Sequence, residues 1–366
     1  MIIYYLIFLV LSFLAYREIS NPKSFNSYSI VFLVILFSVF IGLRNEIGCD
    51  WEGYKNLFNR EICTSIQDDL SFKNSCLSSF EYFKYKEIGF SLVNLIIKTI
   101  GGNFYVANYI FSLLFLIPIL KFCSNLERPY LAILISYPYL ITVIGLGAIR
   151  QSIAIALLMI CINELREKRF YKYFIYISIS TLFHYSSFIF IFLPLLIDLK
   201  KDKNIKRIRR WLLGLFSVFI LLFLIFNDNF LMKQLSGYLY RTDPISFMTP
   251  LIIWIMISIP ASIILLNYKA FRKDDSNHFW RNYSLFGIFM FLPIFFNTII
   301  AFRFLYYFYP IKIYALSNLS KIERFKKYPK STFLTIFIFS LSILTIWLNF
   351  ANHSYCYVPY KNLLLR

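Results

Sequence analysis

The stretch LAILISYPYLITVIGLGAIRQSIAIALLMICINEL, residues 131–165, contains two apolar segments separated by a short break. Each segment approaches the roughly 20 residues that a membrane-spanning helix needs. The GLGA run at 145–148 interrupts the helical pattern, and Arg150 and Gln151 begin the second segment. An arginine at bilayer depth costs roughly 2.5–3.5 kcal/mol on insertion scales, so it usually faces a polar cavity. The stretch therefore predicts a helical hairpin in a membrane, with a charged group at its turn.

The composition extends this prediction to the whole chain. Of 366 residues, 59% are hydrophobic and 20% aromatic, and the mean hydropathy is +0.63. A soluble domain cannot bury that much apolar surface, whereas a bilayer can. We predict an all-α integral membrane protein of about 12 transmembrane helices at about 20 residues each. We predict a single polytopic membrane domain that comprises residues 1–366.

The basic residues indicate which loops face the cytoplasm and which face outside. The formal net charge is +19, and Lys and Arg concentrate in short loops at 166–172, 200–210, 269–281 and 321–330. Such loops usually face the cytoplasm, so membrane topology explains the basic excess without a nucleic-acid partner. Alternation then places both termini outside, together with a large loop at about 44–103 and a second loop at about 228–248.

One apolar segment, at about 86–100, breaks the alternation if it spans the membrane. It is short, opens with Lys86 and Glu87, and closes on Gly101 and Gly102. We predict an interfacial or re-entrant helix there. Because successive loops alternate between the two sides of the membrane, several polar residues that are scattered in sequence are predicted to lie at the outer face. Some spans, such as 171–183, are shorter than the hydrocarbon core, which predicts a depression in this face that opens outward. The polar residues predicted at this face are Arg44, Asp50, Glu87, Arg150, His184, Arg241, Asp243 and Arg303.

Two acidic positions are candidates for chemistry. The run at 42–54 contains Arg44, Asp50 and Tyr54, which place a cation and carboxylates close to the membrane, although a solvated loop has the same composition. Glu87 opens the short helix, where the positive helix end can hold a carboxylate ionised or bind an anionic ligand beside it. Simple N-terminal capping by Glu87 is the alternative.

The arginines are candidates for binding phosphate. Arg150 and Gln151 begin a helix, and a helix N-terminus with a guanidinium fork suits a diphosphate. The alternative for Arg150 is snorkelling to the interface. Arg303 starts a predicted span at 303–319, after a turn near Asn297, and its aromatic neighbours favour a ligand role. Arg241 lies in an outer loop, where surface charge is the alternative. The candidates for binding the diphosphate or the rest of the substrate are Arg44, Tyr54, Arg150, Gln151, Arg241, Arg303 and Tyr307.

A histidine completes the candidate site. His184 lies at a turn between two apolar segments. Imidazole can exchange a proton near neutral pH or donate to a phosphate oxygen. A histidine bound to a backbone carbonyl is the alternative.

Cysteines and metal ligands are sparse. Cys63 and Cys76 can pair if their polar loop is extracytoplasmic, while Cys123 and Cys161 are expected to pack as small apolar side chains. The sequence has three histidines, no zinc-type Cys/His spacing and no Asp-x-Asp pair. We therefore expect no metal and no cofactor, with arginines neutralising the charge that a divalent ion would otherwise neutralise.

The order of these motifs resembles the EpsG family of polysaccharide-assembly proteins, which is grouped with the Wzy polymerases of O-antigen and capsule. The motifs are Gly-Leu-Arg-(x)3-Gly-x-Asp-(x)3-Tyr, then Glu-x-Gly-Phe, Ile-Arg-Gln-Ser-Ile-Ala, Phe-His-Tyr-Ser-Ser, Arg-(x)3-Tyr and a terminal Pro-Tyr-Lys. The resemblance extends from about residue 30 to the end. The chain departs from the pattern at Cys49-Asp50-Trp51-Glu52 and in a long insert between Arg60 and Phe83.

The resemblance implies an enzyme of the bacterial inner membrane with its active site facing the periplasm. Such a glycosyltransferase moves a glycan from undecaprenyl diphosphate to the non-reducing end of another lipid-linked repeat unit. Arg44, Arg150 and Arg303 would clamp the diphosphate, and Asp50 or else Glu87 would take the acceptor proton. His184 would orient the acceptor or donate to the departing phosphate. Membrane lipids and a chain-length regulator are the other expected partners.

Two other functions stay open at this stage. A flippase for lipid-linked oligosaccharide would also have about twelve spans and a cationic cavity, although its arginines should lie at mid-span. An O-antigen ligase uses the same donor with a different acceptor.

Overall fold

The computed structural model describes residues 1–21, 24–59, 61–62, 76–77, 87–197, 247–273 and 278–364. Within these ranges the regular secondary structure is helical apart from two very short parallel strands, β1 (Glu61–Ile62) and β2 (Cys76–Leu77). The predicted all-α class is confirmed.

Six helical segments in the described ranges are long and apolar enough to cross a membrane. They are α1 (Ile2–Ser20), α6 (Phe104–Ser124), the run Pro129–Gly147, α13 (Met248–Leu266), the run Thr298–Ser317 and α20 (Pro329–Phe350). Three shorter apolar helices accompany them: α2 (Ser27–Gly42), α5 (Ile88–Thr99) and the 3-10 helix η3 (Tyr185–Leu196). The chain is thus a multi-pass membrane protein. The count of about twelve spans stays a prediction, since residues 198–246 lie outside the described part of the chain.

The remaining helices are too short, or in the case of α9 (Ile149–Arg166) too charged, to belong to this set. They are α3 (Trp51–Asn59), α9, α10 (Phe170–Phe183), α14 (Tyr268–Phe271), α15 (Phe279–Phe289), α16 (Leu292–Phe296), α19 (Glu323–Lys327) and the 3-10 turns η5 (Leu319–Lys321) and η6 (Ser354–Cys356). At 12 residues, α5 is about 18 Å long at 1.5 Å per residue, too short for a hydrocarbon core of about 30 Å.

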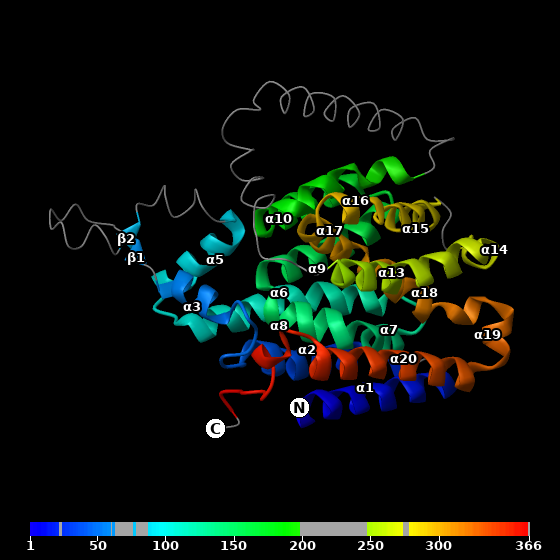
Figure 1. Cartoon of the computed structure of the whole chain (residues 1–366), viewed down its shortest axis with the longest axis horizontal. Coiled ribbons are helices and arrows are strands. Elements are labelled where there is room, and N and C mark those ends of the chain that lie inside the picture. The colour runs from blue at the N-terminus through cyan, green and yellow to red at the C-terminus, as the bar shows by residue number, and fades with distance from the viewer. Residues whose placement is uncertain are drawn as a thin grey trace, which may run out of the picture.

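The helices lie side by side, with both termini, α3 and α5 at one end of the bundle and α14 and α19 at the other (Figure 1). Three predicted basic loops meet at that second end. The guanidinium of Arg166 lies 5.7 Å from the ring of Trp280 and 5.8 Å from that of Tyr314. The ammonium of Lys321 lies 5.6 Å from the same Tyr314 ring. The fourth basic loop, 200–210, is outside the described residues.

The predicted break in the central hairpin is present. The first arm runs through α7 (Pro129–Ser136), the π-helix η2 (Tyr137–Ile144) and α8 (Gly145–Gly147). The π-turn begins next to Pro138, whose nitrogen cannot donate to the helical ladder. Ala148 then leaves the helical conformation, with φ −108° and ψ 69°, and α9 starts at Ile149. Arg150 therefore lies in the first turn of a new helix.

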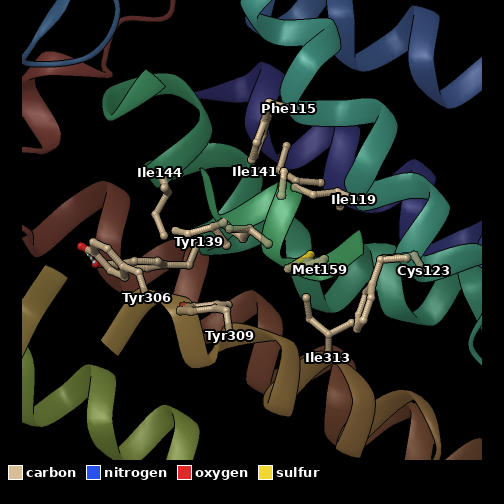
Figure 2. Close-up of a cluster of buried hydrophobic side chains, with 14 of the residues drawn as sticks. Phe115, Ile119, Cys123, Tyr139, Ile141, Ile144, Met159, Tyr306, Tyr309 and Ile313 are labelled. Carbon is tan, nitrogen blue, oxygen red and sulfur yellow. Dashed lines mark hydrogen bonds between the residues drawn. The ribbon is translucent and has the colours of Figure 1, made fainter. Parts of the chain in front are cut away.

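The core joins α6, η2 and α9 to α18 (Tyr309–Ser317) (Figure 2). Phe115, Ile119, Met159 and Ile313 are all 5% exposed or less. Tyr139 lies in the same cluster, and its hydroxyl is 3.1 Å from that of Tyr306 in the 3-10 turn η4 (Tyr306–Phe308). This packing fixes α9 against the helix that follows Arg303.

The predicted turn near Asn297 is also present. The Asn297 side chain accepts a hydrogen bond from the Ile300 amide at 2.9 Å and caps α17 (Thr298–Leu305). The prediction that a span begins at Arg303 is wrong, because α17 already begins at Thr298 and Arg303 lies in its last turn. The capping asparagine sets the earlier start.

Candidate active site

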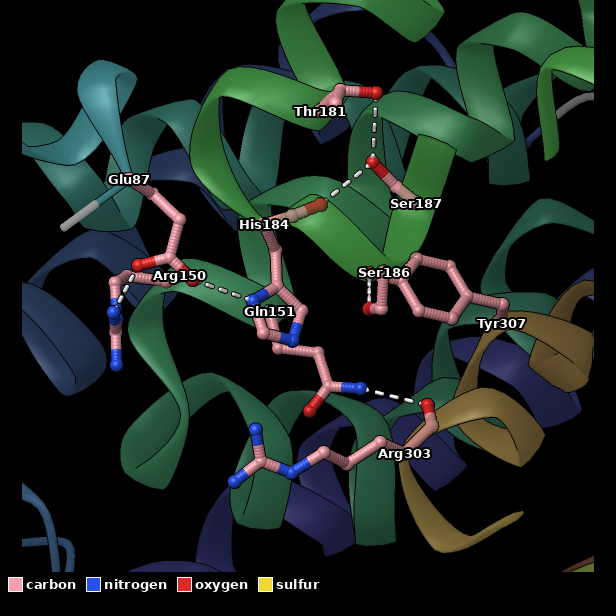
Figure 3. Close-up of polar contacts among 9 residues, drawn as sticks. All are labelled: Glu87, Arg150, Gln151, Thr181, His184, Ser186, Ser187, Arg303 and Tyr307. Carbon is pink, nitrogen blue, oxygen red and sulfur yellow. Dashed lines mark hydrogen bonds and ion pairs between the residues drawn. The ribbon is translucent and has the colours of Figure 1, made fainter. Parts of the chain in front are cut away.

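A buried carboxylate joins three distant parts of the chain at the end of the bundle that contains the termini. The Nδ1 atom of His184 lies 2.9 Å from Oε1 of Glu87, and Arg150 donates from Nη1 to Oε2 of the same carboxylate (Figure 3). The side chains of Glu87 and His184 are 6% and 7% exposed, and that of Arg150 is 32% exposed. The predicted alternation of helices had placed these three residues at one face, and the structure brings them into contact.

The Glu-x-Gly motif explains how Glu87 reaches this position. A Cβ on Gly89 would lie 3.1 Å from the backbone of Leu182, so glycine lets α5 approach the end of α10 closely. Glu87 directly precedes α5 but makes no side-chain capping hydrogen bond. The capping alternative is therefore wrong, because both carboxylate oxygens are directed at His184 and Arg150.

His184 is held in one orientation by its turn. It ends α10, and its carbonyl accepts hydrogen bonds from the Ser187 amide at 3.0 Å and the Ser187 hydroxyl at 2.9 Å. A carboxylate accepts hydrogen bonds only, so the neutral ring carries its proton on Nδ1 and leaves a lone pair on Nε2. That Nε2 is buried and has no hydrogen-bond partner in the described part of the chain. The ring is bound by a carboxylate and not by the backbone carbonyl of the alternative.

The electrostatic surroundings favour a carboxylate beside a neutral imidazole. Burial lowers the pKa of His184 below its usual 6.5, the charges of Arg150 and Arg303 act in the same direction, and Glu87 opposes them. Burial by itself would raise the pKa of Glu87, but the hydrogen bond with His184 and the charge of Arg150 outweigh it, so that this pKa lies below 4.5. Both groups are thus in the form that suits proton acceptance at neutral pH.

Neighbouring residues contact the Arg150 side chain and the Arg303 backbone. The guanidinium of Arg150 lies 5.8 Å from the ring of Tyr54, and its Nε is buried without a hydrogen-bond partner among the described residues. Gln151 donates from Nε2 to the carbonyl of Arg303 at 2.8 Å, which ties α9 to α17. Tyr307 and Ser186 join η4 to η3 through hydroxyls 2.9 Å apart. Gln151 and Tyr307 therefore hold the helices around the site together.

Arg44 is bound by backbone carbonyls at the end of α2. It is 1% exposed, and its Nε and Nη1 donate to the carbonyls of Ile47 and Ile41 at 3.1 and 2.6 Å. Burial lowers the pKa of this guanidinium to about 10. Because its donors satisfy the carbonyls at the end of α2, we assign Arg44 to the scaffold. Asp50 is exposed directly before α3, and Arg241 lies outside the described residues.

A disulfide joins Cys49 to Cys356, 307 residues further along the chain. Sequence reasoning missed this pair, because the separation leaves no local signal. The proposed Cys63 to Cys76 bond cannot be compared, since Cys63 lies outside the described residues and only the backbone of Cys76 lies within them. Cys123 and Cys161 are buried free thiols, as predicted.

These features define a multi-pass helical membrane protein with a buried Glu-His pair and arginines at one end of the bundle. The EpsG family model matches residues 27–362, nearly the whole chain, so the protein belongs to the EpsG family. Members of this family are polysaccharide polymerases of the Wzy type. None of the curated proteins and none of the solved structures that were compared matches the chain.

Proposed function

We propose that this protein polymerises lipid-linked oligosaccharide repeat units of an O-antigen or related surface polysaccharide. It transfers the glycan from undecaprenyl diphosphate to the non-reducing end of another lipid-linked unit. The observation that carries the proposal is the unpartnered Nε2 of His184, held by Glu87 beside Arg150. Membership of the EpsG family supplies the substrate class.

Two observations support a site on the periplasmic face of the bacterial inner membrane. The Cys49–Cys356 disulfide lies at the same end as the Glu87 site, and disulfides persist in oxidising compartments such as the periplasm. The basic loops around Arg166 and Lys321 lie at the opposite end, where positively charged loops usually meet the cytoplasm. We therefore orient the chain with both termini outside.

In the proposed reaction, His184 is the general base. Its Nε2 accepts the proton of the acceptor sugar hydroxyl as that oxygen bonds to the anomeric carbon of the donor glycan. Glu87 keeps the imidazole in the Nδ1-protonated form and stabilises the imidazolium that results. This assigns the base to His184, with Glu87 as its positioning residue, and leaves Asp50 outside the proton transfer.

The anomeric bond to the diphosphate breaks as the new bond forms, and the electron pair leaves with the diphosphate. Arg150 and Arg303 neutralise this developing charge, because guanidinium groups bind phosphate oxygens through a planar fork. A displacement in one step inverts the anomeric centre. The proposed chemistry requires no metal, so turnover should survive chelation with EDTA.

A complementation experiment tests the function. A strain deleted for this gene is complemented with the wild type, with His184→Ala or with His353→Ala, whose side chain is exposed and serves as a matched control. We expect long-chain polysaccharide with the wild type and His353→Ala. We expect only single repeat units with His184→Ala, since a general base contributes about 10²–10⁴-fold to a rate.

The same gel separates the rival functions. Loss of even the single repeat unit in the deletion strain would contradict polymerisation and favour an O-antigen ligase or a flippase. Normal chains with His184→Ala, at wild-type protein levels in the membrane, would remove His184 from the mechanism.

A further inference from the structure

Three segments that are far apart in sequence interlock next to the active site. They are the loop at 43–50, the hairpin break at 143–150 and the C-terminal tail at 351–364. The Gly48 amide donates to the carbonyl of Cys356 at 2.9 Å, and a Cβ on Gly48 would lie 2.4 Å from the carbonyl oxygen of Leu146. Gly48 has a φ of +99°, which also favours glycine. The loop is therefore packed between the other two segments.

Tyr357 is the residue through which the tail contacts the hairpin break. It is 4% exposed, and its hydroxyl donates to the carbonyl of Val143 at 3.1 Å. The same oxygen lies so close to Gly147 that a Cβ at that position would overlap it. On its other side, the Tyr357 carbonyl accepts from the Tyr4 hydroxyl at 2.7 Å, and Trp347 packs against its ring edge to face with centroids 4.4 Å apart. Tyr357 thus stabilises the hairpin break at 143–150, next to which Arg150 begins α9.

The tail is fastened on both sides of Tyr357. The Cys49–Cys356 disulfide lies immediately before it. After it, the Leu363 amide donates to the carbonyl of Leu43 at 2.9 Å, and the Asn45 amide donates to the carbonyl of Lys361 at 3.0 Å. Residues 357–361 are therefore clamped between a covalent bond and a pair of backbone hydrogen bonds.

We propose that Tyr357 is a positioning residue for Arg150, and that the Cys49–Cys356 disulfide locks the C-terminal tail in the place where Tyr357 acts. Tyr357 contacts Gly147, three residues before Arg150. If the tail moved away, the start of α9 would become more mobile, and the Arg150 guanidinium would no longer be held in one position. This inference rests on the proposed function only for the diphosphate role of Arg150. A consequence is that full activity requires the oxidised cysteine pair.

Hydrogen exchange on the purified full-length protein tests the coupling. The variants are Tyr357→Phe, which removes only the hydroxyl, and the double variant Cys49→Ser with Cys356→Ser. Tyr355→Phe is the control, because Tyr355 belongs to the same tail but is 73% exposed. We expect exchange at 145–152 to rise about three- to tenfold in the first two and to stay at the wild-type rate in the control. Unchanged exchange at 145–152 would overturn the proposal.

Binding of inorganic pyrophosphate separates positioning from general destabilisation. Tyr357→Phe should weaken binding in the wild-type background and have no further effect in Arg150→Ala, because the two residues act through one group. Additive effects would show that Tyr357 acts elsewhere and would contradict the proposal. If the wild type binds no pyrophosphate, the diphosphate role of Arg150 fails, while the exchange experiment still decides whether the tail holds the hairpin.

Discussion

Glu87 and Glu164 are both buried and ion-paired, but they lie at opposite ends of the bundle and differ in kind. Glu164 is paired with Arg169, five residues away, whose side chain is 45% exposed. Glu87 binds Arg150 and His184, which are 63 and 97 residues away. The Nε2 atom of His184 has no hydrogen-bond partner among the described residues. A local pair at a helix end stabilises structure and topology. A long-range cluster with an unsatisfied nitrogen is typical of a site awaiting substrate.

The largest expected difference comes from removing one charge at each end. Glu87→Gln should lower turnover by about 10²-fold, because the amide cannot stabilise the imidazolium that forms on His184. Glu164→Gln should leave turnover within about twofold, because this carboxylate lies at the opposite end of the bundle from the site and its arginine partner is partly exposed. Initial rates on lipid-linked substrate check both variants. Equal losses would mean that the two carboxylates do not differ in function.

Arginine substitutions at the two ends of the bundle should also differ in their effect on turnover. Arg303→Lys should reduce turnover by about tenfold, because an ammonium lacks the planar fork that binds two phosphate oxygens. The matched change Arg169→Lys, at the opposite end, should have little effect. Steady-state kinetics with purified protein would measure both, and wild-type turnover by Arg303→Lys would contradict the diphosphate role.

The pH dependence tests the assigned base. His184 must be unprotonated to accept a proton, and its pKa is lowered below 6.5, so turnover should be flat at neutral pH and fall only on the acid side of 6.5. Glu87 raises this pKa and Arg303 lowers it. The acid limb should therefore move to lower pH in Glu87→Gln and to higher pH in Arg303→Ala. Shifts in the opposite directions would exclude His184 as the titrating base.

The smallest effect on turnover is expected at a purely structural carboxylate. Glu18 accepts hydrogen bonds from the amides of Tyr130 and Leu131, both at 3.1 Å, at the start of α7. Glu18→Ala should reduce stability by about 1 kcal/mol, as the loss of a helix cap does, and leave turnover unchanged. Thermal unfolding and activity measured on the same preparation would show whether the two properties separate.

Local signals predicted much of the fold. The GLGA run predicted the break before Arg150, and the short segment at about 86–100 is the observed α5. Loop charge placed the segments around Arg166 and Lys321 at one end, where they meet. The alternation that follows from loop charge then brought Glu87, Arg150 and His184 to a common face. These features depend on composition and on hydrophobic pattern, which are visible within a few residues.

Contacts between distant segments could not be predicted. Nothing near Cys49 indicates Cys356 as its partner, and the hydrogen bonds that bury Arg44 form only once α2 has met its following loop. The contact between Glu87 and His184, which are 97 residues apart, could likewise not be predicted from a local pattern. The role of the terminal Pro-Tyr-Lys motif also depends on a distant contact: the Tyr360 hydroxyl donates to the carbonyl of Phe40 at 2.6 Å.

The most direct test is polymerisation by the purified protein in proteoliposomes with undecaprenyl-diphosphate-linked repeat units and EDTA. This mechanism predicts a ladder of lipid-linked chains and release of one undecaprenyl diphosphate for each bond formed, with both lost in His184→Ala. Wild-type protein that binds the donor but forms no ladder and releases no undecaprenyl diphosphate would contradict the proposed polymerase.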